Sequence, residues 1–432
     1  MGYVKRNITK ISGRNWLIVV LLGLAGQIAW NVENSWFNTF VFDMITPDPK
    51  PIAWMSAVSA VTATITTLVM GTLSDRLGKR KSFILYGYIL WGISTIVFPT
   101  TAFIKITSLA VIAVVAADAV MTFFGSTAYD SAFNAWTTDI SDTTNRGTLS
   151  SIISILPLIA AIIGSALSGV LIDKLGYYTF FYTLGAAVSL MGIVGGLMLR
   201  DSSKLLKKPK NKAESFIKDL LSVFSIESIK KNWELYLVLI SLSLFSSAFL
   251  IFYPYVMIYL NNYLKISKTA AGIVTAVSVL ISILIAVPAG KLADRGYMKK
   301  LAFSAPFIIS FGSVLFSFSK NIYLVTITAS LQFIGYLVMI ITVGAWIKNL
   351  MPEESRGQFE GVRMIFNVAI PMIIGPSIGS FLITRYGIYT VLKGKPGFIP
   401  TPVIFQAAAA VFITSIIPMI IIKRKQEGKE EI

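Results

Sequence analysis

The chain has 432 residues, of which 55% are hydrophobic and only 14% are charged, and its mean hydropathy is +0.73. Because soluble domains carry about 25% charged residues, this composition excludes a soluble fold and predicts an all-α membrane protein. The formal net charge of +17 would favour nucleic-acid binding in a soluble protein, but the basic residues lie at the ends of apolar runs, so we expect no nucleic-acid partner.

Twelve apolar runs follow one another along the chain, each near the roughly 20 residues that cross a bilayer. They begin near Trp16, Ile52, Phe83, Leu109, Leu149, Tyr177, Trp233, Ala270, Leu301, Tyr323, Val362 and Pro402. A polar stretch divides them six and six. We therefore expect an N-terminal six-helix half at residues 1–199, a cytoplasmic linker at 200–232, a C-terminal six-helix half at 233–423 and a cytoplasmic tail at 424–432.

Two of the polar connections have features of their own. In the linker, the apolar positions from Glu214 to Phe224 recur at helical spacing, which predicts a short amphipathic helix on the inner membrane surface. A purely solvated linker is the alternative. The segment from Arg385 to Pro400 is rich in Gly and Pro and predicts an outer loop between the last two spans.

Basic residues are concentrated in alternate loops, which places both termini in the cytoplasm by the positive-inside rule. These residues include Lys5, Arg6, Lys10 and Arg14, then Arg76, Lys79, Arg80 and Lys81, then Arg295, Lys299 and Lys300, and finally Lys423, Arg424 and Lys425. The other loops also carry lysines (Lys265, Lys268, Lys393, Lys395), so the orientation depends on the excess. The first run lacks a small-residue cleavage site and predicts a retained helix. We expect a multi-pass protein of the cell (plasma) membrane.

The chain contains neither Cys nor His. This excludes disulfides and thiol chemistry and removes both the usual proton relay at neutral pH and the commonest metal ligand. There is also no phosphate-binding glycine loop and no zinc-protease motif. We therefore expect neither an enzyme nor an ATP-driven pump, no cofactor and no metal site, and any proton or ion chemistry must use carboxylates.

A short motif occurs twice and indicates an internal duplication. Residues 71–81 read GTLSDRLGKRK and residues 290–300 read GKLADRGYMKK, each in a basic loop between two apolar runs. A second pair, Asn145-Arg146-Gly147 and Ser355-Arg356-Gly357, lies in the second basic loop of each half. Two similar membrane halves in tandem are typical of carriers that work by alternating access. The sequence therefore predicts a carrier.

The duplicated motif resembles the loop signature of the major facilitator superfamily. The resemblance implies that superfamily's fold, with twelve transmembrane helices in two six-helix pseudo-repeats. It also implies a gating motif that comprises Gly71, Asp75, Arg76, Gly78, Arg80, Asp294 and Arg295. From the residues alone, Arg80 and Lys81 can pair with acids of neighbouring spans, or the basic loops only fix the topology. The second copy departs from the signature at Tyr297 and Met298.

Polar residues inside the first span form a stripe. Gln27, Asn31, Asn34 and Asn38 follow the spacing i, i+4, i+7, i+11, which places four amides on one helical face within about 60°. We expect them to line a substrate-binding cavity, although amides also join helices. Glu33 lies about 120° from the stripe. It either binds a coupling cation or proton or pairs with a basic residue near the outer surface.

The fourth span carries two acids. Asp130 shares a face with Ser126, Asn134 and Thr137, and Asp118 lies about 120° away. Ionisable residues within a span are costly and are by default functional candidates. We predict that Asp130 and Asn134 form an acid–amide pair that binds a coupling ion beside a hydroxylated substrate, with Asp118 a further candidate. The alternative is a structural ion pair of Asp130 with Arg146 or Arg363.

The second half offers neutral polar groups in its spans instead of acids. Tyr253, Gln332 and Tyr336 are the predicted substrate contacts, with hydroxyls of the seventh and eighth spans, Tyr255 among them, beside them. Aromatic faces and hydroxyls suit a neutral sugar ring, which stacks on its apolar face and hydrogen-bonds at its edge. This asymmetry suggests a coupling ion in the first half and a neutral solute beside it.

A narrower resemblance rests on the residues around these acids. Gln27-x-x-Trp30-Asn31, the first loop motif, and Asp130-x-x-x-Asn134 followed by Asp139, Asp142 and Arg146 resemble the glycoside-pentoside-hexuronide cation symporters and the related sucrose carriers. The resemblance implies that Asp130 takes part in cation or sugar binding. The second span lacks the acids of melibiose-type carriers, which favours H⁺ or another cation site over Na⁺ binding of their kind.

We therefore expect a secondary active transporter, most simply an H⁺- or Na⁺-coupled symporter of a sugar or glycoside. The alternative is a proton-coupled exporter of drugs, lipids or other small amphipathic molecules, and carriers of nucleosides or peptides share the same features. The expected partners are the small-molecule substrate and the lipid bilayer, with the protein acting as a monomer.

Overall fold

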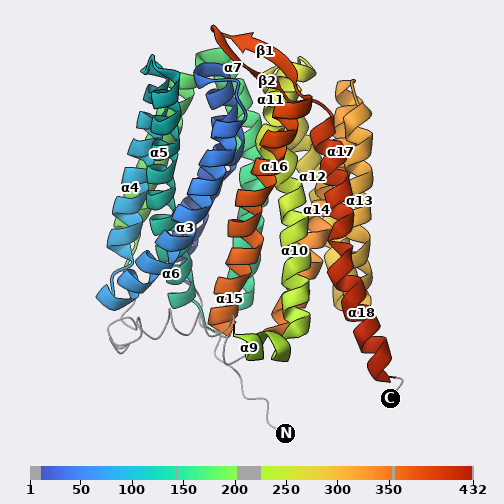
Figure 1. Ribbon diagram of the computed structural model, residues 1–432. Coiled ribbons are helices and arrows are strands. Elements are labelled where there is room, and N and C mark those ends of the chain that lie inside the picture. Colours follow the sequence, from blue (N-terminus) through green and yellow to red (C-terminus); the bar gives the residue numbers. More distant parts are fainter. Residues whose placement is uncertain (1–10, 143–144, 202–224, 353–355, 431–432) are drawn as a thin grey trace. The chain divides into compact units, whose positions relative to one another are not determined.

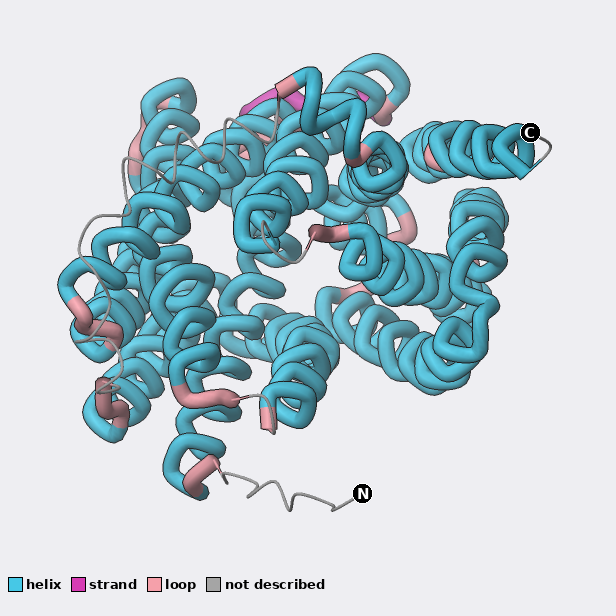
Figure 2. Tube along the Cα trace, turned by 90° about the horizontal axis from the view of Figure 1, so that it is seen from below, coloured by secondary structure: helices cyan, strands magenta, loops and turns pink. Residues whose placement is uncertain are grey.

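The computed structural model describes residues 11–142, 145–201, 225–352 and 356–430. Almost all of the described chain is helical, and one short hairpin holds the strands (Figure 2). The predicted amphipathic helix from Glu214 to Phe224 lies outside the described residues, as does Ser355 of the second repeated pair.

Contacts between residues divide the chain into two compact units. Unit 1 comprises Met1–Glu33 and Val61–Asn211, and unit 2 comprises Asn34–Ala60 and Lys212–Ile432. The predicted division into halves at residues 199 and 233 rests on the repeat and stays a prediction. Residues 34–60 belong to the first half by sequence but to unit 2 by contacts.

The helices of unit 1 are long and are joined by short turns (Figure 1). They are α1 (Gly13–Val32), the part of α3 (Lys50–Leu77) from Val61 onwards, α4 (Lys81–Val97), the 3₁₀ turn η3 (Phe98–Phe103), α5 (Thr107–Gly125), the π-helical η4 (Ser126–Phe133), α6 (Asn134–Asp139) and α7 (Arg146–Met198).

Unit 2 begins with the π-helical η1 (Glu33–Phe37), which passes from unit 1 into unit 2 after its first residue. It continues with α2 (Asn38–Phe40), the π-helical η2 (Val41–Ile45) and the start of α3. Then follow α9 (Ile226–Lys231), α10 (Trp233–Phe252), η6 (Tyr253–Tyr255), α11 (Val256–Ile258), η7 (Tyr259–Tyr263), α12 (Lys268–Leu292), η8 (Ala293–Tyr297), α13 (Met298–Phe318), α14 (Ile322–Leu350), α15 (Arg356–Met364), η10 (Ile365–Ala369), α16 (Ile370–Tyr386), β1 (Ile388–Leu392), β2 (Lys395–Ile399), α17 (Val403–Thr414) and α18 (Ile416–Glu430).

The described residues contain ten helical segments long and apolar enough to cross a membrane. Two of them, Arg146–Met198 and Lys268–Phe318, have 53 and 51 residues, which is about 75–80 Å at 1.5 Å per residue and more than twice the bilayer core. Gly176 interrupts the first with φ 77° and Gly296 the second with φ 93°. Each segment therefore holds two spans, and the prediction of twelve spans in an all-α membrane fold is confirmed.

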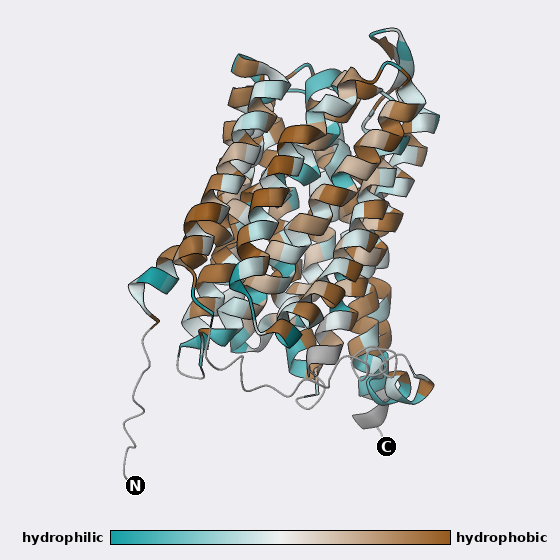
Figure 3. Cartoon of the chain, turned by 90° about the vertical axis from the view of Figure 1, so that its left-hand side faces the viewer, coloured by the Kyte–Doolittle hydropathy of each residue, from teal (hydrophilic) through white to brown (hydrophobic). Residues whose placement is uncertain are grey.

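Hydrophobic residues cover the middle of the helices, whereas hydrophilic residues gather at their ends (Figure 3). Large apolar side chains on the helix surfaces, such as Ile112, Leu284 and Ile327, are exposed in the isolated chain. Contiguous apolar surface of this extent requires lipid around it.

Small residues bring the helices close together within each unit. In unit 1, a side chain at Gly92 of α4 would collide with the carbonyl oxygen of Gly185 in α7, and one at Gly185 would collide with that of Gly92. In unit 2, a Cβ at Gly335 of α14 would lie 2.6 Å from the backbone nitrogen of Ile309 in α13. Close backbone contact through small residues is the usual way in which helices pack in a bilayer.

The predicted outer loop from Arg385 to Pro400 contains the β1–β2 hairpin. Its strands are antiparallel, from Ile388 opposite Ile399 to Leu392 opposite Lys395. The two turn residues, Lys393 and Gly394, have φ values of 51° and 75°. Two positive φ values in a two-residue loop define the turn that best matches the twist of a hairpin.

Candidate functional site

Glu33, Asp118 and Asp130 lie in unit 1 within spans predicted from the sequence. Glu33 occupies the start of η1, Asp118 lies in α5 and Asp130 lies in η4, and the exposed fractions of Glu33 and Asp118 are only 8% and 2%. The Thr122 hydroxyl donates a hydrogen bond to Glu33 Oε1 at 3.2 Å, and the charges of Asp118 and Asp130 both act on Glu33. Two of the acids thus lie where a helix widens to π geometry, as is frequent at functional sites.

The membrane spans of unit 1 supply no basic side chain to these acids. Residues 15–49, 51–75, 82–104, 106–145, 147–173 and 175–199 contain no Lys, Arg or His. Ionisable residues inside a membrane span are costly and are by default functional candidates. The cluster of Glu33, Asp118 and Asp130 is therefore suited to take up protons or a small cation, and sequence analysis had not predicted that these acids act on one another.

Asp130 does not use its predicted partner. Its carboxylate oxygen Oδ2 accepts a hydrogen bond from the Ser126 hydroxyl at 2.9 Å. The exposed Asn134 side chain donates to the backbone carbonyl of Asp130 at 3.1 Å, and not to its carboxylate. The Asn134 side chain therefore does not hydrogen-bond the Asp130 carboxylate directly, and the prediction that the two residues together bind a coupling ion stays a prediction. The ion pairs Arg80–Asp75, Arg80–Asp139, Lys268–Asp43 and Lys299–Glu234 do not include Asp130.

The amide stripe of the first span is divided at the unit boundary. In unit 1, Gln27 donates to the Tyr129 hydroxyl at 2.8 Å, and Asn31 Oδ1 accepts from the Ser165 hydroxyl at 3.4 Å. These amides therefore join α1 to η4 and α7. In unit 2, the Asn38 side chain donates to the carbonyl of Asn34 at 3.1 Å. The π-helical η1 begins between the two pairs and contains Asn34. A substrate-binding role for the four amides stays a prediction.

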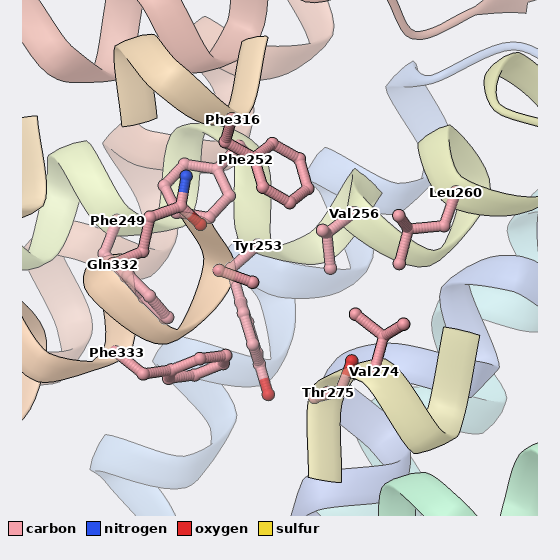
Figure 4. Close-up of a pocket in the computed structure, with 11 residues that line it drawn as sticks. Phe249, Phe252, Tyr253, Val256, Leu260, Val274, Thr275, Phe316, Gln332 and Phe333 are labelled. Atoms are coloured by element: carbon pink, nitrogen blue, oxygen red, sulfur yellow. The ribbon is translucent and has the colours of Figure 1, made fainter. Parts of the chain in front are cut away.

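Two of the predicted contacts of the second half, Tyr253 and Gln332, line one cavity in unit 2 (Figure 4), and the third, Tyr336, is not part of its lining. Tyr253, Gln332 and Thr275 line it, and its volume of about 20 Å³ has room for about one water. The other lining residues are apolar: Phe249, Phe252, Val256, Leu260, Val274, Phe316, Ala329 and Phe333. Tyr253 extends between Phe333 and Thr275 in this view.

Phe249 connects the predicted aromatic residues, although sequence analysis did not single it out. Its ring stacks on Tyr253 at 4.8 Å and on Tyr336 at 4.4 Å between centroids. Gln332 donates to the Ser313 hydroxyl at 3.3 Å, which orients its amide. The signal that could have found Phe249 is its position four residues before Tyr253, since residues at i and i+4 share a helix face.

The first copy of the loop motif forms a buried charge network in unit 1. Arg80 is 2% exposed and pairs with Asp75 and, at 3.2 Å from its Nε, with Asp139 of α6. Asp201 accepts hydrogen bonds from the backbone N–H groups of Arg80 and Lys81 at 2.7 and 2.8 Å. It therefore caps the N-terminus of α4, where negative charge is favoured. Gly78 has φ 63° in the turn, which explains why this position is glycine.

Comparison with known proteins identifies the family. The sequence matches the profile of the Major Facilitator Superfamily over residues 16–367 and 240–432. The chain belongs to this superfamily. It is therefore related to membrane transporters. A search of curated proteins found no match.

Solved structures of superfamily-type transporters resemble this fold at low sequence identity. The nucleoside transporter NupG has a TM-score of 0.73 at 13% identity, with 94% of this chain and 98% of that chain covered. The xylose transporter XylE from E. coli has a TM-score of 0.66 at 11% identity, with 93% and 96% covered. A POT family transporter in complex with a thioalcohol-conjugated peptide has a TM-score of 0.71 at 11% identity, with 95% and 96% covered.

The second copy of the superfamily loop motif differs from the first. Asp294 and Arg295 are exposed in η8. Lys299, which is equivalent to Arg80, is half exposed, with its Nζ 3.9 Å from Glu234 and 3.0 Å from Gln426. The buried charge network is therefore not repeated in unit 2. This copy also departs from the signature at Tyr297 and Met298, as noted from the sequence.

Proposed function

We propose that this superfamily transporter couples the movement of a sugar or glycoside to a cation gradient, as a symporter. The observation that carries the proposal is that Glu33, Asp118 and Asp130 lie inside membrane spans of unit 1, where hydroxyls of Thr122 and Ser126 donate hydrogen bonds to Glu33 and Asp130. We further propose that it acts as a monomer in the plasma membrane with both termini in the cytoplasm, in accordance with the basic loops.

The coupling ion would neutralise the acid cluster of unit 1. A carboxylate that is protonated or ion-bound costs less in a closed, water-free state than an ionised one, so ion binding would favour closure of the carrier around its solute. We favour H⁺, because the second predicted span, residues 52–72, carries none of the acids found there in melibiose-type carriers.

The solute would bind through the neutral groups of unit 2. The stack of Tyr253, Phe249 and Tyr336 offers aromatic faces, and Gln332 and Thr275 offer hydrogen-bonding groups beside it. A sugar ring matches both, since its axial hydrogens stack on an aromatic face and its hydroxyls bond at the edge. The cavity of about 20 Å³ would have to widen for such a ring.

The apolar lining of the same cavity favours a second candidate. Most of its wall is apolar, and four phenylalanines contribute to it: Phe249, Phe252, Phe316 and Phe333. A proton-coupled exporter of small amphipathic molecules would use such a wall directly.

The deciding experiment is transport in proteoliposomes. We expect a sugar- or glycoside-induced current under an H⁺ or Na⁺ gradient that Asp130→Asn abolishes. The matched control is Asp173→Asn, the same change at the exposed end of a span in unit 1, which should keep the current. If no sugar or glycoside induces a current, although the melting curve shows that the protein is folded, the sugar proposal is overturned. Export of apolar molecules is then favoured.

A further inference from the structure

One end of unit 2 joins residues 34–60 to the later part of the chain by polar contacts. Asp43 Oδ2 lies 3.1 Å from Lys268 Nζ, and the two side chains are 20% and 23% exposed. Lys395 Nζ donates to the carbonyl of Ile45 at 2.8 Å. The contacts therefore link η2 both to the start of α12 and to the β1–β2 hairpin.

The hairpin also contacts the backbone of residues 34–60 at Pro47. The Phe398 N–H donates to the carbonyl of Pro47 at 3.0 Å. Gly397 lies directly against Pro47, and a side chain at Gly397 would collide with its backbone. The buried Tyr255 hydroxyl donates to the carbonyl of Pro49 at 3.3 Å and lies 2.9 Å from that of Pro376. Sequence analysis had predicted Tyr255 beside the substrate, but its hydroxyl is engaged here.

Residues 34–60 are joined covalently to unit 1 at both ends, although their contacts are with unit 2. This segment continues α1 through η1, and at its other end α3 runs without a break from Ala60 into Val61 of unit 1. The segment is thus held by unit 2 through contacts and by unit 1 through two helices. In a carrier whose halves rock against each other, any separation at this end must release the contacts or bend both helices.

We propose that Asp43, Ile45 and Pro47, with Lys268, Lys395 and Gly397–Phe398, form a releasable outer gate, the hairpin latch. It stabilises the state that is closed at this end and opens once in each transport cycle. Its contacts suit that role, because they are polar and partly hydrated and leave no buried charge unpaired on release. The proposal depends on alternating access and not on the identity of the solute or coupling ion.

The test is a charge swap read by thiol labelling, which requires no substrate. Because the chain has no Cys, Thr46→Cys introduces a single thiol beside the latch, where Thr46 is buried. We expect Lys268→Asp to raise its rate of labelling by a membrane-impermeant maleimide about tenfold. The swap Asp43→Lys with Lys268→Asp should return the rate toward its original value.

Two further variants make the result decisive. Gly397→Ala should also speed labelling at Thr46→Cys, because its Cβ disrupts the fit on Pro47 without any change in charge. A separate single thiol at Thr401→Cys, beyond the hairpin, should label at the same rate with and without Lys268→Asp, which shows that unit 2 stays folded. Unchanged labelling at position 46 in both Lys268→Asp and Gly397→Ala would overturn the latch. It would also be overturned if the double variant Asp43→Lys with Lys268→Asp were labelled as fast as Lys268→Asp alone.

Discussion

Replacing Arg80 with alanine is expected to abolish transport and to destabilise the protein. Arg80 is almost fully buried and pairs with Asp75 and with Asp139, which is only 12% exposed. Removing the shared cation leaves Asp139 without its partner, and loss of one partner from a buried pair costs about 3–5 kcal/mol. We expect the lower end of that range, since Asp75 is half exposed. Thermal unfolding in detergent and transport in proteoliposomes measure the two effects.

The internal duplication supplies the control for this experiment. Lys299→Ala changes the equivalent position of the second loop, where the side chain is half exposed and its ion pair with Glu234 spans 3.9 Å. Exposed pairs contribute about 0–1 kcal/mol, so this variant should keep both stability and transport. Equal losses in Arg80→Ala and Lys299→Ala would contradict a special role for the first loop. Asp75→Asn should impair transport without unfolding the protein.

Glu33→Gln is expected to uncouple the transporter from its ion gradient. Glu33 is buried, accepts a hydrogen bond from Thr122, and is acted on by the charges of Asp118 and Asp130. A neutral glutamine cannot release a proton or bind a cation, so the variant should exchange solute across the membrane but fail to accumulate it. Counterflow and gradient-driven uptake in the same proteoliposomes separate these two activities.

The matched control for this prediction is Glu227→Gln. It makes the same substitution in the exposed helix α9 and should leave both activities intact. Gradient-driven accumulation by Glu33→Gln at the original level would remove Glu33 from the coupling site. Loss of counterflow as well would show that the side chain serves solute binding or folding instead.

Much of this fold can be predicted from the sequence, because each of its signals is local. Apolar runs separated by basic loops predict twelve spans, and the repeated motif predicts a duplicated carrier. The environment of Arg80 is harder to foresee, since Asp139 and Asp201 come from other spans. The hairpin latch is harder still, because Asp43 and Lys268 lie in different halves of the sequence.

The sequence analysis assumed α-helical spacing throughout each span, and the structure departs from that spacing in its π segments. Asp130 lies in η4, whereas Asn134 begins α6 directly after it. In the first span, η1 begins between Asn31 and Asn34, where the boundary between the two units also falls. Propensity and hydropathy carry no signal for π segments, whose formation depends on how neighbouring helices pack.

The first span passes from one unit to the other within η1. Glu33 is the last residue of unit 1, and Asn34, its neighbour in the same continuous helix, is the first of unit 2. A continuous helix that joins two rotating bodies must bend, and π segments are common sites of helix bends. During alternating access we therefore expect the first span to bend beside Glu33, next to the acid that we propose as part of the coupling site.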